Sequence, residues 1–164
     1  MLEIRKSYPT DAYALINISD ITWKNAFYDI LPNGILHDNI HNIEKRVRHL
    51  QDQINENNRI FVALEDGVPI GYIFYAKAQN VVYDAAAEIR SIYILPEFQK
   101  QGIGTKLFEN VLEEIKHLGY TEATIGVDKN NYIALHLYQS KGFTNILYDG
   151  KDENGEFYKL MKQL

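Results

Sequence analysis

The stretch Gln99-Lys100-Gln101-Gly102-Ile103-Gly104-Thr105 connects a predicted strand, which ends near Leu95, to the most regular helix pattern in the chain. In that pattern, over residues 104–118, apolar side chains recur every three or four positions, and Gly119 follows as a helix C-cap. The first N–H groups of a helix have no partner inside it and carry the positive end of its dipole, so glycines there let a phosphate approach the bare backbone. The stretch therefore predicts either a phosphate-binding turn or simply a tight turn, and the glycines alone do not distinguish the two.

Two common nucleotide-binding motifs do not fit the same stretch. A P-loop requires Lys followed by Ser or Thr directly after its second glycine, whereas Thr105 follows Gly104 here. A dinucleotide-binding fingerprint requires a third small residue where Leu107 stands. ATP and NAD are therefore disfavoured as ligands.

On both sides of this stretch, strand patterns alternate with helix patterns. The Asp66-Gly67 pair predicts a hairpin turn, and residues 152–155 predict a second one near the C-terminus. The expected strands are residues 2–6, 59–65, 70–78, 88–95, 121–127, 143–148 and 157–161; the expected helices are residues 14–31, 40–54, 104–118 and 134–140, with a loop over 80–86. This order of elements predicts a mixed α/β sheet with helices packed on it.

The composition is that of one ordinary soluble domain. The chain has 164 residues, of which 46% are apolar and 24% charged, so we expect a single domain over residues 1–164 with its own core. Without cysteine the chain has no disulfide, no zinc–thiolate cluster and no thiol nucleophile. Its formal charge of −5 argues against general binding to nucleic acid and favours small or cationic partners.

The sequence also predicts no association with a membrane. No apolar run approaches the ~18 residues of a spanning helix, and charged residues such as Glu3 and Arg5 stand where a signal peptide would need apolar ones. We therefore expect a cytoplasmic protein. Whether it forms a homodimer is left open by the sequence.

The five histidines predict no metal site. His37 and His41 lie four residues apart, as on one helix face, but no Glu between them completes a His-Glu-x-x-His motif and no third ligand is evident. We expect a solvated pair and no bound metal.

Further motifs flank the glycine stretch in a fixed order. The strand segment 92–94 and Pro96 precede it, and the pattern Asn131-x-x-Ala134-x-x-x-Tyr138-x-x-x-Gly142-Phe143 follows it. Together with Gln99-x-x-Gly102-x-Gly104, these motifs cover residues 88–143 and resemble the GNAT superfamily of N-acetyltransferases. The resemblance implies a single-domain α/β fold with a mixed, mostly antiparallel central sheet of about seven strands and four helices, the GNAT-like acyl-CoA-binding fold.

The resemblance further implies that acetyl-coenzyme A is the co-substrate. The backbone of residues 101–105 would hold the pyrophosphate, and the main chain of residues 92–94 would pair with the pantetheine arm. Asn131 would bond the pantetheine or the pyrophosphate, although Asn is also a favoured helix N-cap. Lys100 and Lys106 would either assist with a phosphate or lie at the ordinary surface. The residues so assigned to the coenzyme are Ile92, Tyr93, Ile94, Gln99, Lys100, Gln101, Gly102, Ile103, Gly104, Thr105 and Asn131.

Acyl transfer to an amine requires a group that accepts the proton of the amine. Glu88 is the candidate base, because it begins the strand before the glycine motif and its offset from Gln99 resembles that of the catalytic glutamate in histone-acetylating members of the family. The alternative is a structural ion pair with Arg90, which lies two residues on and therefore on the same strand face. Many relatives deprotonate the amine through water, so both interpretations stay open.

The departing thiolate also requires a proton donor, and Tyr138 is the candidate general acid. In the family, a tyrosine at this position directs its hydroxyl at the coenzyme A sulfur, and a phenol, whose ordinary pKa is near 10, stays protonated until the thiolate leaves. The alternative is a core aromatic residue, one among twelve tyrosines. A backbone N–H of residues 92–94 would hold the oxyanion, and that role leaves no trace in the sequence.

The acceptor is the least determined part of the expected site. In the family, the first two helices and the last strands frame the acceptor pocket, so Trp23, Phe27 and Tyr28 are candidate walls, with core packing as the alternative for Trp23. Residues 149–156 are mainly acidic, which suits either a rim that attracts a cationic amine or a solvated hairpin. Polyamines, aminoglycosides, amino acids and protein N-termini all stay open.

The expected function is therefore an acetyl-CoA-dependent N-acetyltransferase that acts on a primary amine of a small molecule or peptide. Because no cysteine can carry the acyl group, the amine would attack directly within a ternary complex. The alternative is a non-catalytic acyl-CoA-binding module, which would keep the glycine motif without needing Glu88 or Tyr138.

Overall fold

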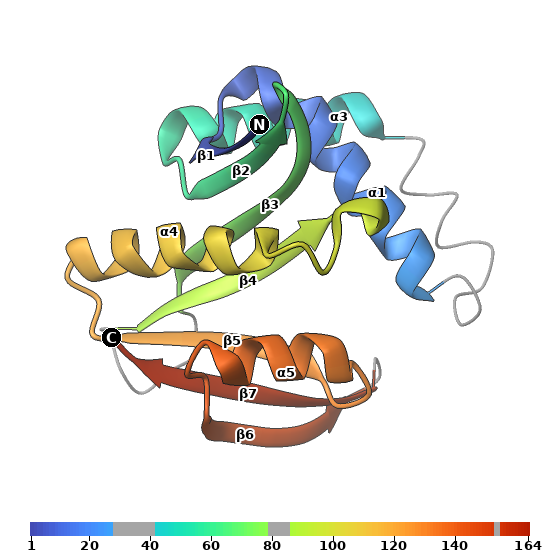
Figure 1. Cartoon of the computed structure of the whole chain (residues 1–164). Helices are drawn as coiled ribbons and strands as arrows, with labels where there is room; N and C mark the ends of the chain where they lie inside the picture. The colour runs from blue at the N-terminus through green and yellow to red at the C-terminus, as the bar shows by residue number, and fades with distance from the viewer. Residues whose placement is uncertain (28–41, 79–85, 153–154) are drawn as a thin grey trace. The chain divides into compact units, whose positions relative to one another are not determined.

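A computed structural model describes residues 1–27, 42–78, 86–152 and 155–164 of the chain (Figure 1). The elements in chain order are β1 (Leu2–Lys6), η1 (Pro9–Asp11), α1 (Ala12–Phe27), α3 (Ile43–Glu56), β2 (Ile60–Glu65), β3 (Val68–Lys77), β4 (Ala86–Ile94), η2 (Pro96–Phe98), α4 (Ile103–His117), β5 (Glu122–Asp128), α5 (Tyr132–Ser140), β6 (Asn145–Asp152) and β7 (Gly155–Gln163). The predicted order of strands and helices is confirmed.

The seven strands are hydrogen-bonded in the order β1-β2-β3-β4-β5-β7-β6. β1 and β2 pair antiparallel, as do β5 with β7 and β7 with β6. β4 and β5 pair in parallel, with Glu88 opposite Thr124. The expected α/β fold, with a mixed and mostly antiparallel sheet of seven strands and four described α-helices, is thus confirmed.

The contacts divide the described chain into two compact units. Unit 1 comprises residues 1–73 and 92–107, and unit 2 comprises residues 74–91 and 108–164. Strands β3 and β4 and helix α4 each contribute residues to both units. In unit 1, buried side chains of α1 and β2 such as Leu15 and Val62 form the core, and an ion pair between Arg46 Nη2 and Asp20 Oδ1, at 2.7 Å, links α3 to α1.

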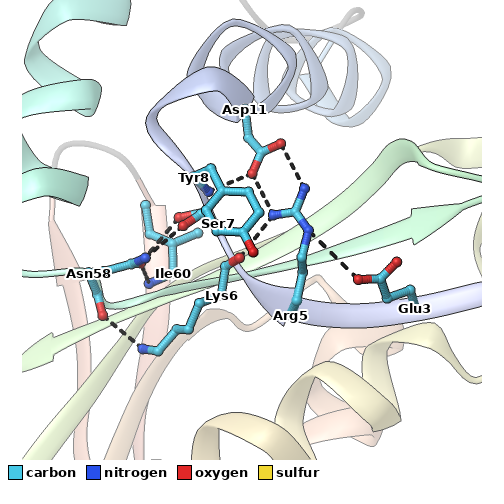
Figure 2. Close-up of polar contacts among 8 residues, drawn as sticks. All are labelled: Glu3, Arg5, Lys6, Ser7, Tyr8, Asp11, Asn58 and Ile60. Atoms are coloured by element: carbon cyan, nitrogen blue, oxygen red, sulfur yellow. Dashed lines mark hydrogen bonds and ion pairs between the residues drawn. The ribbon is translucent and has the colours of Figure 1, made fainter.

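A polar cluster connects β1 to the start of the first helix (Figure 2). Arg5 donates from Nη1 and Nη2 to the two carboxylate oxygens of Asp11, at 2.7 and 3.1 Å, and the backbone N–H of Tyr8 donates to Asp11 Oδ2 at 2.6 Å. Burial raises the pKa of Asp11, but the bonds from Arg5 and Tyr8 outweigh it and hold that pKa below its ordinary value. The carboxylate therefore joins the end of β1 to the 3-10 turn that precedes α1.

Alternate residues of the strands of unit 2 form its core, because successive side chains of a strand point to opposite faces. Ile89, Ile125 and Leu160 are each 2% exposed and lie on one face of β4, β5 and β7. Phe108 of α4 is buried as well, and its ring lies 6.0 Å from that of Phe143, centroid to centroid.

Several predicted boundaries are wrong by one or two residues, among them the starts of β3, α5 and β7 at Val68, Tyr132 and Gly155, and two of the errors concern residues of the predicted motifs. Phe143 was expected to begin a strand, but β6 begins at Asn145, and Phe143 is a fully buried residue that follows Gly142 at φ +89°. β4 begins at Ala86 rather than at residue 88, because Ala86 and Ala87 already pair with β5. Residues 28–41, which include the end of the first predicted helix and the start of the second, lie outside the described residues.

Within the four described segments, no helix is both long enough and apolar enough to cross a bilayer.

Candidate active site

The glycine stretch forms the turn between η2 and α4 in unit 1. Lys100 and Gly102 have left-handed backbone angles, φ +60° and +80°, and α4 begins directly afterwards at Ile103. The backbone N–H of Lys106 donates to Gly102 O at 3.2 Å, which is the bond that opens the helix. The N–H groups of residues 103–105 come before it and have no partner within the described part of the chain. They form an open helix N-terminus.

The glutamines of the stretch brace the turn instead of extending toward a ligand. Gln99 Nε2 donates to Ile94 O, and Gln101 Nε2 donates to Glu97 O, both at 2.9 Å. These bonds hold the turn against the end of β4 and against η2. By contrast, a Cβ added to Gly102 would find no atom within 4 Å, so the space over this glycine is open. The backbone, more than the side chains, is therefore what a ligand would meet.

Strand β4 leads into this turn and has different neighbours along its length. Its parallel register with β5 covers only Ala86 to Ile89. Farther along, Leu95 N donates to Ile70 O of β3 at 2.9 Å, and a Cβ on Gly71 would come within 2.8 Å of Tyr93 O. Glycine at position 71 therefore allows the close approach of β3 to this part of β4.

An aromatic group lies beside the same segment of β4 in unit 1. Trp23 of α1 is 43% exposed and donates from Nε1 to the hydroxyl of Tyr93 at 2.9 Å. The rings of Tyr93 and Tyr72 lie 5.4 Å apart, centroid to centroid, and burial raises the pKa of Tyr72. Trp23 is therefore a partly exposed side chain and not a core residue. Phe27 ends α1, whereas Tyr28 lies outside the described residues.

In unit 2, Glu88 on β4 is held between two cations. Arg90 Nε lies 2.8 Å from Glu88 Oε2, and Lys159 Nζ of β7 contacts Glu88 Oε1. The ion pair with Arg90, which is the structural alternative for Glu88, is thus present. Burial lowers the pKa of the Lys159 ammonium, while its contact with Glu88 favours the charged form.

Sequence reasoning missed Lys159. It reaches Glu88 because β7 pairs with β5, which places Lys159 opposite Gly126 and on the face that also carries Glu88. No local motif of the sequence indicates this contact, since it depends on the register of two strand pairs.

Tyr138 and Asn131 also belong to unit 2. The Tyr138 ring is 8% exposed and lies edge-on to Phe108, with centroids 5.6 Å apart. The ring therefore packs in the core, which leaves the hydroxyl as the group that could act chemically. Asn131 Oδ1 accepts a hydrogen bond from Ala134 N at 3.1 Å, so its role as the N-cap of α5 is confirmed.

The predicted site residues are thus grouped within each unit. Unit 1 carries residues 92–105 and Trp23, and unit 2 carries Glu88, Tyr138 and Asn131. The described segments hold no group of three His, Asp or Glu side chains that could bind a metal ion, and His37 and His41 lie outside them.

Comparison with known proteins bears on the same region of the chain. A family model described as "Acetyltransferase (GNAT) family" matches residues 20–143, which include the glycine turn and α5. The chain is 30% identical over 84 residues to the L-amino acid N-acyltransferase MnaT of Escherichia coli strain K12, which is 51% of this chain and 49% of that protein. It is 24% identical over 155 residues to a spermidine N(1)-acetyltransferase of Thermoplasma acidophilum, covering 92% of this chain and 93% of that enzyme.

The match thus spans about half the length of the first of these relatives. Among solved structures, the fold is similar to that of the PaiA N-acetyltransferase from Thermoplasma acidophilum in complex with coenzyme A, with a TM-score of 0.78 at 22% identity, over 100% of this chain and 99% of that one. It is also similar to YncA, a putative acetyltransferase from Salmonella typhimurium with acetyl-CoA, with a TM-score of 0.74 at 18% identity, over 99% and 94% of the two chains.

Proposed function

The chain belongs to the GNAT family of acetyltransferases, and from this premise we propose that it transfers an acetyl group from acetyl-coenzyme A to the primary amine of a small molecule or peptide. The observation that carries the proposal is the open N-terminus of α4, which follows β4 through the Gly102 turn. We further propose that the chain acts as a single domain over residues 1–164 in the cytoplasm.

The residues of the turn fit the phosphates of a coenzyme. Three successive backbone N–H groups, those of residues 103–105, lack a partner among the described residues and lie at the positive end of the helix dipole. The open space over Gly102 lets a phosphate reach them, and Lys100 and Lys106 flank them with positive charge. An anion with two linked phosphates satisfies this arrangement, and residues 92–94 offer an adjacent main chain for an extended arm.

Bound acetyl-coenzyme A would supply an acetyl group activated as a thioester. Glu88 would accept a proton from the ammonium form of the acceptor, which frees the nitrogen to bond to the acetyl carbon, and Tyr138 would give its phenolic proton to the sulfur as the carbon–sulfur bond breaks. A backbone N–H of residues 92–94 would stabilise the negative charge on the acetyl oxygen. The products are an amide and coenzyme A: the second proton lost by the nitrogen restores the tyrosine, and Glu88 releases its proton to solvent.

The ion pairs of Glu88 are compatible with this role. Arg90 and Lys159 each contact one carboxylate oxygen of Glu88, and an arriving ammonium group would replace one cation with another. A purely structural Glu88 would keep both partners throughout the reaction. The two roles differ in the pH dependence of the rate.

The proposed function is tested by measuring coenzyme A release from acetyl-coenzyme A with a panel of primary amines. We expect thiol to appear only when an amine is present, together with the acetylated amine in mass spectra. Binding of acetyl-coenzyme A is followed separately, by the melting temperature. If acetyl-coenzyme A raises the melting temperature but no amine releases thiol, the chain is a non-catalytic acyl-CoA-binding module and the proposal is wrong.

A further inference from the structure

Arg90 presents part of its guanidinium group to solvent beside the proposed base. Its side chain is 35% exposed, and only its Nε atom contacts Glu88, at 2.8 Å. The two Nη groups have no partner among the residues that the structure describes. The guanidinium group is thus a planar fork of N–H donors that is held at Nε. Such a fork binds a carboxylate through two parallel hydrogen bonds.

Strand β5 offers open space beside Lys159, the second cation that contacts Glu88. Glu88 lies opposite Thr124 on β5, and Gly126, two residues farther on the same face, lies opposite Lys159 on β7. A Cβ on Gly126 would find no atom within 4 Å, so the face of β5 next to Lys159 is open. All these residues belong to unit 2.

Among the charged groups in direct contact at Glu88, the cations outnumber the carboxylates by two to one. Arg90 and Lys159 are two cations that share the single carboxylate of Glu88. The other charged side chains that the register places on the same face of β5 are Glu122 and Asp128, one at each end of the strand. Each accepts a hydrogen bond from a neutral donor, Gln163 Nε2 at 2.8 Å for Glu122 and Asn130 N at 2.7 Å for Asp128, while Glu122 Oε2 has no partner among the described residues.

Two carboxylates of the acidic segment 149–156 are already paired with lysines. Asp149 contacts Lys129 Nζ, and Glu156 lies 3.8 Å from Lys151 Nζ and 4.0 Å from Lys129 Nζ. These carboxylates are therefore paired with lysines of their own unit. A polyamine would gain little from them, and it would meet like charge at Arg90.

We propose that Arg90 binds the carboxylate of the acceptor, and that the acceptor is an α-amino acid or a similarly zwitterionic amine whose amino group is directed to Glu88. In such a molecule one carbon separates the amine from the carboxylate, and in this chain the complementary carboxylate and guanidinium groups are adjacent on β4. The inference rests on the proposed function and names its substrate class.

The test compares acceptors that differ only in the carboxylate. Coenzyme A release is measured for a panel of α-amino acids, each beside its carboxamide and its decarboxylated amine, and for spermidine. For the best amino acid we expect kcat/KM to exceed that of its two analogues by roughly 10- to 100-fold, chiefly through KM, as for the loss of a charge-assisted hydrogen bond. Spermidine is expected to be a poor acceptor.

The variants assign that preference to Arg90. Arg90→Gln should reduce the preference roughly 10- to 100-fold through KM, and Arg90→Lys, which keeps the charge but lacks the fork, should retain only part of it. Lys151→Gln removes a similar charge from an exposed lysine elsewhere in unit 2 and should leave the preference unchanged. A variant whose melting temperature rises with acetyl-coenzyme A is folded. If Arg90→Gln does not fold, the substrate preference of Arg90→Lys tests the role of Arg90 instead.

The outcomes separate this inference from the proposed function. If carboxamides, decarboxylated amines or spermidine react as well as the amino acid, or if the Arg90 variant that folds keeps the full preference, the role of Arg90 is wrong while the acetyltransferase activity stands. If no acceptor of any kind releases coenzyme A, the proposed function itself fails, and this inference fails with it.

Discussion

Glu88 is the residue on which the proposed chemistry most depends, and its two cationic neighbours change how its role can be tested. Replacing the carboxylate leaves Arg90 and Lys159 without their partner, so a loss of stability is expected whether Glu88 acts as a base or only as an ion-pair partner. Stability alone therefore does not distinguish the two roles. The pH dependence of the rate distinguishes them. If Glu88 is the base, its contribution to the rate falls as the amine loses its own proton at high pH, whereas the contribution of an ion-pair partner does not.

We expect Glu88→Gln to lower kcat roughly 100-fold at neutral pH, where an alkyl amine is protonated and needs a base. The deficit should shrink as the pH approaches the pKa of the amine, near 10, because free amine then becomes abundant. The pH–rate profile of the variant is the measurement. Asp149→Asn, which also removes an ion pair in unit 2, is the control and should keep the profile of the parent. A deficit for Glu88→Gln that is constant with pH would assign Glu88 a structural role only.

Tyr138 combines a buried ring with a hydroxyl that we assign to catalysis. Tyr138→Phe keeps the edge-on packing against Phe108 and removes the proton, so we expect kcat to fall roughly 100-fold with little change in coenzyme affinity. Steady-state kinetics with the best amine measures this. Tyr75→Phe is the matched control: Tyr75 is also buried in unit 2 and donates its hydroxyl to Glu114, so its loss should affect stability and not kcat. A Tyr138→Phe variant as fast as the parent would remove Tyr138 from the mechanism.

At the scale of elements, short polar contacts decide how helices and strands connect. The carboxylate of Asp11 joins the end of β1 to the turn before α1 through Arg5 and the N–H of Tyr8 (Figure 2). Asn131 caps α5 in a similar way, through Ala134 N. Both contacts lie within a few residues along the chain, which is why turn and cap signals in the sequence found these boundaries.

The lowered pKa of Asp11 predicts how the stability of the connection between β1 and α1 depends on pH. A carboxylate whose pKa is lower in the folded than in the unfolded chain contributes stability above its unfolded pKa, near 3.9, and loses that contribution as the pH falls through the folded pKa. Asp11→Asn should therefore lower the free energy of unfolding by roughly 1–3 kcal/mol at pH 7, and the difference from the parent should narrow below about pH 4. Urea unfolding at both pH values measures this.

Glu3→Gln provides the control for Asp11→Asn. Glu3 also contacts Arg5, at 3.8 Å, but it is 60% exposed, so its removal should change the free energy of unfolding by only a few tenths of a kcal/mol. If the difference in free energy of unfolding between Asp11→Asn and the parent were the same at acid and neutral pH, the charge of Asp11 would not be what stabilises the connection between β1 and α1.

At the scale of the whole molecule, the proposed coenzyme should stabilise the folded chain by mass action. At a concentration of 100 times Kd, acetyl-coenzyme A would add about 2.7 kcal/mol to the free energy of unfolding and raise the melting temperature. We expect ATP and NAD to do little, because neither of their binding motifs is present. Stabilisation by ATP and not by acetyl-coenzyme A would overturn the coenzyme site.

Two substitutions at Gly102 connect that stabilisation to the turn. Asn and Asp have nearly the same shape and a similar tolerance for the left-handed conformation that Gly102 adopts, at φ +80°. Gly102→Asn should therefore keep most of the increase in melting temperature with acetyl-coenzyme A, whereas Gly102→Asp, which puts a negative charge where we propose that the phosphates bind, should abolish it. Equal shifts for the two variants would show that the phosphates bind elsewhere.

The amino-acid sequence by itself determined the elements of this protein and the place of the glycine turn. The periodicity of apolar residues, the Asp66-Gly67 hairpin and the glycines at 102, 119 and 142 act over a few neighbouring residues, so helices, strands and turns follow from local chemistry. The motifs over residues 88–143 were enough to indicate the GNAT family, to which the family model then assigned the chain.

Only the tertiary structure decided which distant residues meet. β7 lies between β5 and β6, and this order brings Lys159 to Glu88 and leaves Gly126 open beside them. The same packing buries Phe143, which the pattern assigned to a strand, and starts β4 two residues early against β5. Strand order, register and ion pairs between strands depend on hydrogen bonds and packing between segments far apart along the chain, and no local pattern of residues specifies those partners.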